Sequence, residues 1–159
     1  MSILAARTVF KLLDEQFIPQ DYDGPSIRSS YFSPRDHYND IVRAADQYDL
    51  PEILSRFNSM LWQLATYSKG AALVAFSVAA AQEDEALARF AIRHFQDLCH
   101  PIYLSQNTVC DIGSLSWRLL LRAVHGIEPG KIDWPTVARK MIFPKGSVSG
   151  VHTMNVSSG

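Results

Sequence analysis

The segment QYDLPEI, residues 47–53, separates two stretches whose apolar residues recur at helical spacing. Pro51 has no amide hydrogen and disfavours helical backbone angles at Leu50, so a single helix cannot run through this point. The sequence therefore predicts one helix that ends before the segment and a second that starts at once, with Asp49 as its N-cap. So short a connection favours two antiparallel helices.

A similar pattern follows further along the chain. A shift of 33 residues lays EILSRF (residues 52–57) over EALARF (residues 85–90), with QEDE in place of DLPE as the turn. Repeated helical pairs predict stacked units that share one core, although alanine-rich helix pairs are common enough for a chance match. We expect an all-α fold of stacked antiparallel helical hairpins, with about six or seven helices.

The first helix of the chain is expected over residues 3–17. Its predicted inward face comprises Ile3, Val9, Phe10, Leu13 and Phe17. A polar bridge is expected over residues 103–114. We expect a single helical domain over residues 1–143 and a flexible Ser/Gly-rich tail over residues 144–159.

Composition narrows the class of protein. The 159 residues are 47% hydrophobic and 19% charged, with a formal net charge of −1, which is typical of one folded soluble domain. The sequence contains no basic stripe of the kind that indicates nucleic-acid binding. Its most apolar stretch, residues 70–82, is too short to span a membrane. Cys99 and Cys110 are expected to be reduced, buried or half-buried thiols. We expect a cytoplasmic or nuclear protein.

Two groups of polar residues could carry chemistry. Asp36 and Asp40 lie one helical turn apart beside His37, a spacing that suits a hard cation or acid–base work. A solvated helix start, with acids at the positive end of the helix dipole, explains them more simply.

The second group could bind a metal ion. His94 and Asp97 are three residues apart, and Cys99 and His100 follow. Pro101 ends the helix there, and no second set of ligands is evident, so we predict no metal site. His125 is expected to be a favourable cation at a helix end.

The remaining candidates are interpreted as structural. Core or interface packing is expected, rather than base stacking or a ligand cage, for Trp62, Trp117 and Trp134. Four arginines are expected to point outward, where they could form a mild basic face or simply a solvated surface: Arg43, Arg56, Arg89 and Arg93. Signatures of nucleophilic or nucleotide-binding sites are missing. The sequence predicts no catalytic, cofactor or metal site, and no cofactor.

The stretch AADQYDLPEI, residues 44–53, resembles the helical hairpin in the second half of BTB/POZ domains. The segments ILAARTVFKLLDEQFIP (3–19), AALVAFSVAAAQEDEALARFAIRHF (71–95) and SLSWRLLLRAVHGIEPGKIDW (114–134) are similar to the flanking helices of fungal, particularly basidiomycete, BTB proteins. The resemblance implies the C-terminal half of such a domain over residues 3–66, with following helices over 68–143. By this resemblance, the chain lacks the half of the BTB/POZ domain that carries the family's dimer interface.

Two functions follow as expectations. The resemblance implies an intracellular protein–protein interaction module that binds a protein partner or associates with itself, with no nucleic acid or membrane involved. The alternative is a small helical enzyme or ligand-binding protein with an apolar pocket between helices. Tyr38, His94, Trp117 and His125 are the residues to inspect for such a pocket.

Overall fold

The computed structural model describes residues 2–14 and 33–143, and all regular structure within these ranges is helical, which confirms the all-α prediction. These ranges contain eight α-helices, one more than the upper expectation: α1 Ile3–Leu13, α2 Pro34–Gln47, α3 Pro51–Tyr67, α4 Lys69–Gln82, α5 Glu85–Arg93, α6 Gln106–Ile112, α7 Ser114–Val124 and α8 Trp134–Lys140. Phe17 and the predicted tail at 144–159 lie outside the described residues.

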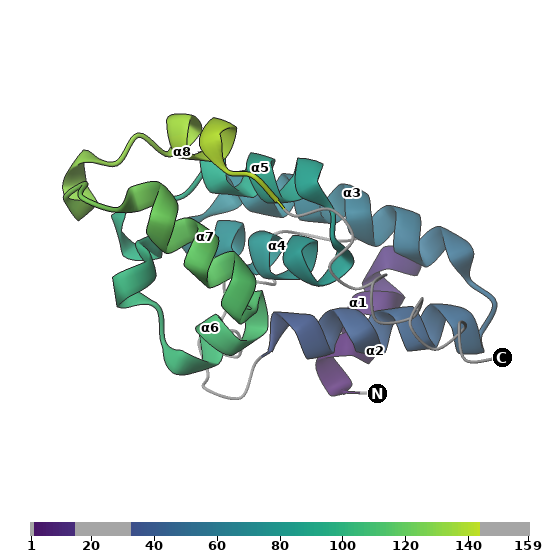
Figure 1. Cartoon of the computed structure of the whole chain (residues 1–159). Helices are drawn as coiled ribbons and strands as arrows, with labels where there is room; N and C mark the ends of the chain where they lie inside the picture. Colours follow the sequence, from purple (N-terminus) through teal and green to yellow (C-terminus); the bar gives the residue numbers. More distant parts are fainter. Residues whose placement is uncertain (1, 15–32, 144–159) are drawn as a thin grey trace, which may run out of the picture.

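Helix α4 occupies the centre of the molecule (Figure 1). It packs against α3 and α5 most extensively and also against α2 and α6. Its buried residues point in all directions around the axis and include the consecutive residues Val74, Ala75, Phe76, Ser77 and Val78. A helix that is apolar on every side is stable in water only when other helices surround it, so α4 organises the packing of its neighbours.

The turn between α2 and α3 has the predicted antiparallel geometry but not the predicted cap. Asp49 adopts a positive φ of 52°, and the amide of Leu50 donates a hydrogen bond to the carbonyl of Ala45 at 2.8 Å. This is the Schellman arrangement, in which a left-handed residue ends a helix. Asp49 therefore ends α2 rather than capping α3, whose N-cap is Leu50 with no side-chain hydrogen bond.

The turn between α4 and α5 repeats this geometry. Glu83 has a φ of 56°, and the amide of Asp84 donates to the carbonyl of Ala79 at 2.9 Å. Because Asp49 corresponds to Glu83, the structural shift between the two hairpins is 34 residues (83 minus 49), and the predicted shift of 33 is wrong by one. The shift of 34 places buried Phe57 on buried Ala91.

Helix α1 is rotated relative to the prediction. Its buried residues are Ala5, Thr8, Val9 and Leu12. Of the predicted inward face, Val9 is buried, but Ile3 is 83% and Phe10 67% exposed, and Leu13 is also exposed. Small residues on the inner face let α1 lie close to α2 and α3, which the larger side chains on the outer face would prevent.

Two helix boundaries also differ from expectation. The helix that Pro101 was expected to end already stops at Arg93, and two single-turn 3-10 helices follow it. The predicted polar bridge contains α6, which begins where the hydroxyl of Ser105 accepts a hydrogen bond from the amide of Thr108. It ends at Gly113, whose positive φ of 84° few other residues adopt easily.

The left-handed residue of the first turn gives a stability prediction. Replacing Asp49 with Gly should raise the free energy of unfolding by about 0.5–1 kcal/mol, because glycine adopts positive φ without steric cost. Replacing Asp46, which lies within α2, with Gly should lower it. Urea denaturation of both variants checks this, and a loss of stability in D49G would contradict the assigned turn.

Candidate functional site

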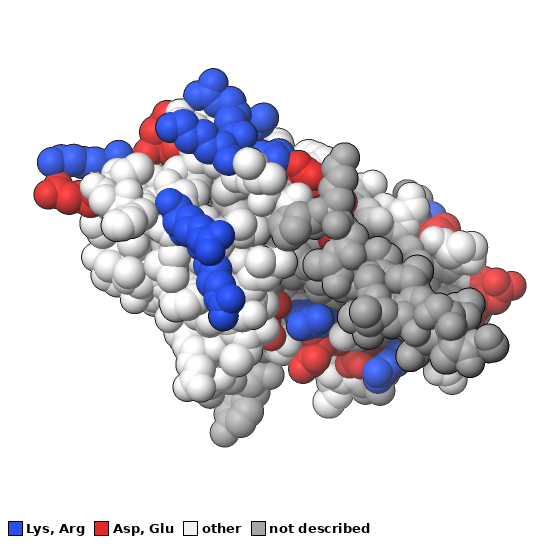
Figure 2. Space-filling view, viewed as in Figure 1, with Lys and Arg blue, Asp and Glu red and all other residues white. Residues whose placement is uncertain are grey.

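A cavity of about 460 Å³ lies where the turn between α4 and α5 faces the junction of α6 and α7. In Figure 2, charged surface of both signs lies near the centre of the view, where α2 begins, and a strip of Lys and Arg runs over α7. The described residues that line the cavity are Arg35, Ala79–Ala81, Glu83–Glu85, Ala88, Asp111–Ser116, Leu119 and Phe143.

Small side chains on α4 and α5 leave this space open. Ala80 and Ala81 lie in the last turn of α4, and Ala88 lies one turn into α5. Leu119 from α7 and Phe143 from the segment after α8 supply larger apolar surface. The cavity therefore combines an apolar wall with a volume in the range of small-molecule sites.

Carboxylates gather on the polar side of the cavity. Asp84 caps α5 by accepting a hydrogen bond from the amide of Leu87 at 3.0 Å. Asp111 accepts a hydrogen bond from the hydroxyl of Ser33 at 2.6 Å. Burial raises the pKa of Asp111 above its usual value, with a further increase from Asp36, whereas the Ser33 hydrogen bond and the charge of Arg35 act in the opposite direction.

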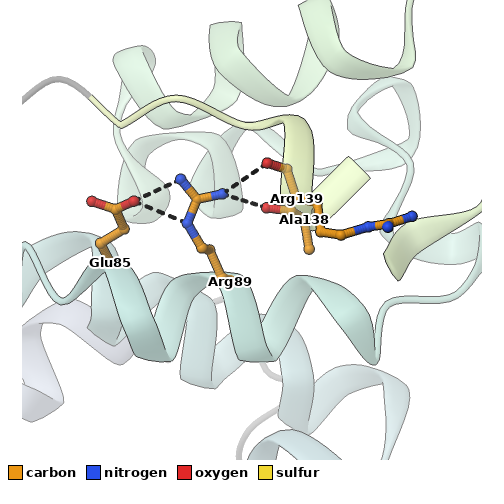
Figure 3. Close-up of polar contacts among 4 residues, drawn as sticks. All are labelled: Glu85, Arg89, Ala138 and Arg139. Atoms are coloured by element: carbon orange, nitrogen blue, oxygen red, sulfur yellow. Dashed lines mark hydrogen bonds and ion pairs between the residues drawn. The ribbon is translucent and has the colours of Figure 1, made fainter. Parts of the chain in front are cut away.

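Arg89 on α5 contacts the C-terminal end of α8, close to the wall that Phe143 forms (Figure 3). The guanidinium of Arg89 forms an ion pair with Glu85 at 2.6 Å and donates to the carbonyls of Ala138 at 2.5 Å and Arg139 at 3.4 Å. It also lies 5.3 Å from the ring centroid of Phe143. One side chain thus satisfies carbonyls at the end of α8 and fixes that end against α5.

Arg56 does the same for α1. It donates to the carbonyls of Leu12 at 2.7 Å and Leu13 at 3.0 Å, at the C-terminal end of that helix. The prediction of a solvated arginine face is therefore wrong for Arg56 and Arg89, whereas Arg43 and Arg93 are exposed as expected. A cation at a helix end also interacts favourably with the helix dipole.

The group at the start of α2 is only in part a solvated helix start. Asp36 is exposed in the first turn of α2, as expected. His37 is instead buried, with its Nε2 3.4 Å from the hydroxyl of Thr8 on α1. Burial lowers its pKa from 6.5 to about 4, against a smaller opposite effect of Asp40. Asp40 itself accepts a hydrogen bond from the amide of Ser2 at 3.0 Å, which lowers its own pKa. Asp40 thus joins α2 to the start of α1.

The second predicted group is split between surface and interior. His94 and Asp97 are exposed, whereas Cys99 and His100 are buried. The Nδ1 of His100 accepts a hydrogen bond from the amide of Ile102 at 3.2 Å. Within residues 2–14 and 33–143 no three potential ligands are close enough to hold a metal ion.

The four residues proposed for inspection do not meet. Tyr38 stacks on Phe57, Trp117 donates to the carbonyl of Pro101 at 3.3 Å, and His94 and His125 are exposed. None of them is among the described residues that line the cavity.

The remaining tryptophan and cysteine candidates differ in their exposure to solvent. Trp134 is buried, as expected for a core tryptophan, whereas Trp62 is partly exposed and packs against Phe90. Cys99 is buried, but Cys110 is exposed rather than buried or half-buried.

The residues of the cavity were missed by sequence reasoning because they come from four separate parts of the chain. A local signal was present in QEDE, where three acids follow an alanine run. The other contributors, Asp111 and Phe143, carry no such signal.

The chain matches no family model, no curated protein and no solved structure. None of the helices in the described ranges combines the length and apolar character needed to cross a bilayer.

The buried histidine gives a pH prediction. Because the folded state keeps His37 neutral and the unfolded state protonates it below pH 6.5, stability should be constant above that pH and fall as the pH drops towards 4. The loss should approach about 3 kcal/mol at pH 4. Urea denaturation between pH 7 and pH 4 measures it.

Two matched variants separate this effect from the other titrating groups. His37→Leu should remove most of the decline between pH 6.5 and pH 5, and His94→Leu, at an exposed position, should retain it. An equally steep decline in H37L would show that His37 is not its source.

The contacts of Arg89 give a second stability prediction. Arg89→Met retains the aliphatic stem but leaves the carbonyls of Ala138 and Arg139 without this donor, so the free energy of unfolding should fall by about 1–2 kcal/mol. Arg93→Met, at an exposed position of the same helix, should change it by less than about 0.5 kcal/mol. Equal effects in urea denaturation would contradict the anchoring role of Arg89.

Proposed function

We propose that the protein is a helical protein–protein interaction module that self-associates through the outward face of α1. The observation that carries the proposal is the exposure of large apolar side chains on that face. Ile3, Phe10 and Leu13 are exposed, with the smaller Ala6 between them. We call these four residues the α1 stripe.

The width of the apolar surface supports a contact beyond this chain. The buried residues of α1 and the α1 stripe together cover roughly two thirds of the helix circumference. A helix that packs on one side of a domain needs only about 100°. The inner residues account for the packing on α2 and α3, so the remaining arc is available to another surface.

The spacing of the α1 stripe suits a second helix. Positions 3, 6, 10 and 13 follow the alternation of three and four residues that places a and d side chains along one helix seam. The order of side-chain sizes also suits an antiparallel copy of the same helix. In that arrangement Ile3 lies opposite Leu13 of the second copy, and Phe10 lies opposite Ala6.

Such a contact is self-complementary under a two-fold axis, which is the commonest symmetry of protein dimers. Pairing a large ring with a small side chain lets the two helices approach closely. The seam is short, because α1 has 11 residues. We therefore expect a reversible dimer with a dissociation constant of roughly 1–100 µM.

The resemblance of residues 44–53 to BTB/POZ domains favours the same class of function, because those domains are protein-interaction modules. The family's own dimer contacts belong to the first half of the domain, which the resemblance does not cover. We therefore propose α1 as the contact surface in their place.

The proposal predicts a concentration-dependent dimer that Phe10→Asp abolishes, because a carboxylate would be buried in the seam. Sedimentation velocity across a dilution series measures both species. Arg7→Asp is the matched control, since Arg7 is exposed on α1 outside the α1 stripe and should leave the dimer intact. A parent chain that stays monomeric at every concentration would contradict the proposal.

The pairing itself is tested by exchanging the two central side chains. Ala6→Phe alone should weaken the dimer by placing two rings opposite each other, and Phe10→Ala alone should weaken it by lost packing. The double variant restores one large and one small residue in each layer and should recover most of the affinity. Additive losses would contradict the antiparallel arrangement.

A further inference from the structure

The cavity beside the turn between α4 and α5 has an acidic lining that is needed neither for the proposed contact of the α1 stripe nor for the packing of the helices. Its lining includes four carboxylates, from Glu83, Asp84, Glu85 and Asp111, against the single guanidinium of Arg35. From this lining and its volume, we propose that the cavity binds a small organic ammonium ion with an apolar body.

The existing partners of the carboxylates leave an excess of negative charge. Glu85 is neutralised by Arg89, and Asp84 is engaged as the cap of α5. Within the described part of the chain, Glu83 and Asp111 form no ion pair. A neutral hydroxyl, that of Ser33, is the hydrogen-bond donor to Asp111. With Arg35 counted against them, the lining and Arg89 together carry a net charge of about −2.

Two positive groups lie at the cavity, and Arg35 is already included in this sum. Arg35 lowers the pKa of Asp111, but water screens its charge because the residue is exposed, as it does the charge of Glu83. The N-terminus of α7 also lies at the cavity, since Gly113 and Ser114 are among the lining residues. Its N-cap, Gly113, has no side chain to accept a hydrogen bond from the first amides of the helix. The partial positive charge of this helix end, about half a unit, is smaller than the excess of carboxylate charge.

The rest of the lining selects an apolar body for the ligand. Ala80, Ala81 and Ala88 form a low wall, and Leu119 and Phe143 supply larger surfaces. A cavity of about 460 Å³ accommodates a molecule with a single aromatic ring and a short amine chain. An inorganic cation would leave this apolar surface unused, and the described residues contain no metal-ligand cluster.

Three probes of nearly equal size separate charge from shape. Phenethylamine is a cation, 2-phenylethanol is neutral, and 3-phenylpropanoate is an anion. We expect phenethylamine to bind at least about tenfold more tightly than the alcohol, and the carboxylate to bind most weakly. Amide chemical-shift titrations at pH 7 measure the affinities, with shifts expected at residues 80–88 and 111–119.

Two variants assign the site. Asp111→Asn keeps an oxygen that accepts the Ser33 hydrogen bond but removes the charge, so it should weaken phenethylamine about tenfold and leave 2-phenylethanol unchanged. Asp97→Asn, on an exposed residue outside the cavity lining, should change neither. Ala81→Phe should fill the cavity and abolish binding of the amine and the alcohol.

Equal affinity for the three probes, tighter binding of the carboxylate, or shifts outside the cavity would overturn the proposal. An equal loss of phenethylamine affinity in D111N and D97N would also overturn it. Thermal melts of each variant confirm that it is folded before its affinity is compared. The titration does not involve α1, so its outcome is independent of the dimer experiment.

Discussion

The burial of α4 on every side is the constraint on which the rest of the structure depends. Phe76, Ser77 and Val78 are all buried although consecutive residues point about 100° apart around the helix axis. Such a helix would expose a large apolar surface if any neighbouring helix were missing. The free-energy cost of that exposure is about 25 cal/mol for each Å² of apolar surface. The helices α2, α3, α5 and α6 therefore have to enclose it. The tight turns after α2 and α4 bring the chain back across it.

The alanine content of α4 has a second consequence. Small side chains allow neighbouring helices to approach closely along most of its length, since alanine adds little width. At its C-terminal end, Ala80 and Ala81 are half-buried, and the nearest larger side chains belong to α7 and the segment after α8. The cavity is thus the place where the enclosure of α4 is incomplete, and the acidic turn that ends the helix gives the cavity its charge.

The helical class and both hairpins could be predicted because they depend on local signals, namely the spacing of apolar residues and Pro51. The rotation of α1 could not, because its apolar arc is too wide to indicate which side is covered. The repeat shift was wrong by one because the match was anchored on Glu52 and Glu85, whereas the structural equivalence is between the left-handed residues Asp49 and Glu83.

Polar residues were harder to place than apolar ones. His37 is adjacent to Asp36 and four residues from a buried isoleucine, and sequence cannot show that α1 covers it. The roles of Arg56 and Arg89 depend on carbonyls more than 40 residues away in the chain. The resemblance to BTB/POZ domains stays a prediction, since the comparisons neither support nor oppose it.

Native-state hydrogen exchange of the amides of α4 tests the central claim most directly. If α4 is enclosed on every side, its central amides should exchange only through global unfolding, with a free energy and a denaturant dependence equal to those of the whole chain. Amides of α1, which has one exposed face, should open at lower free energy. Exchange of the α4 amides through local fluctuations, at or below the free energy of α1, would contradict the account.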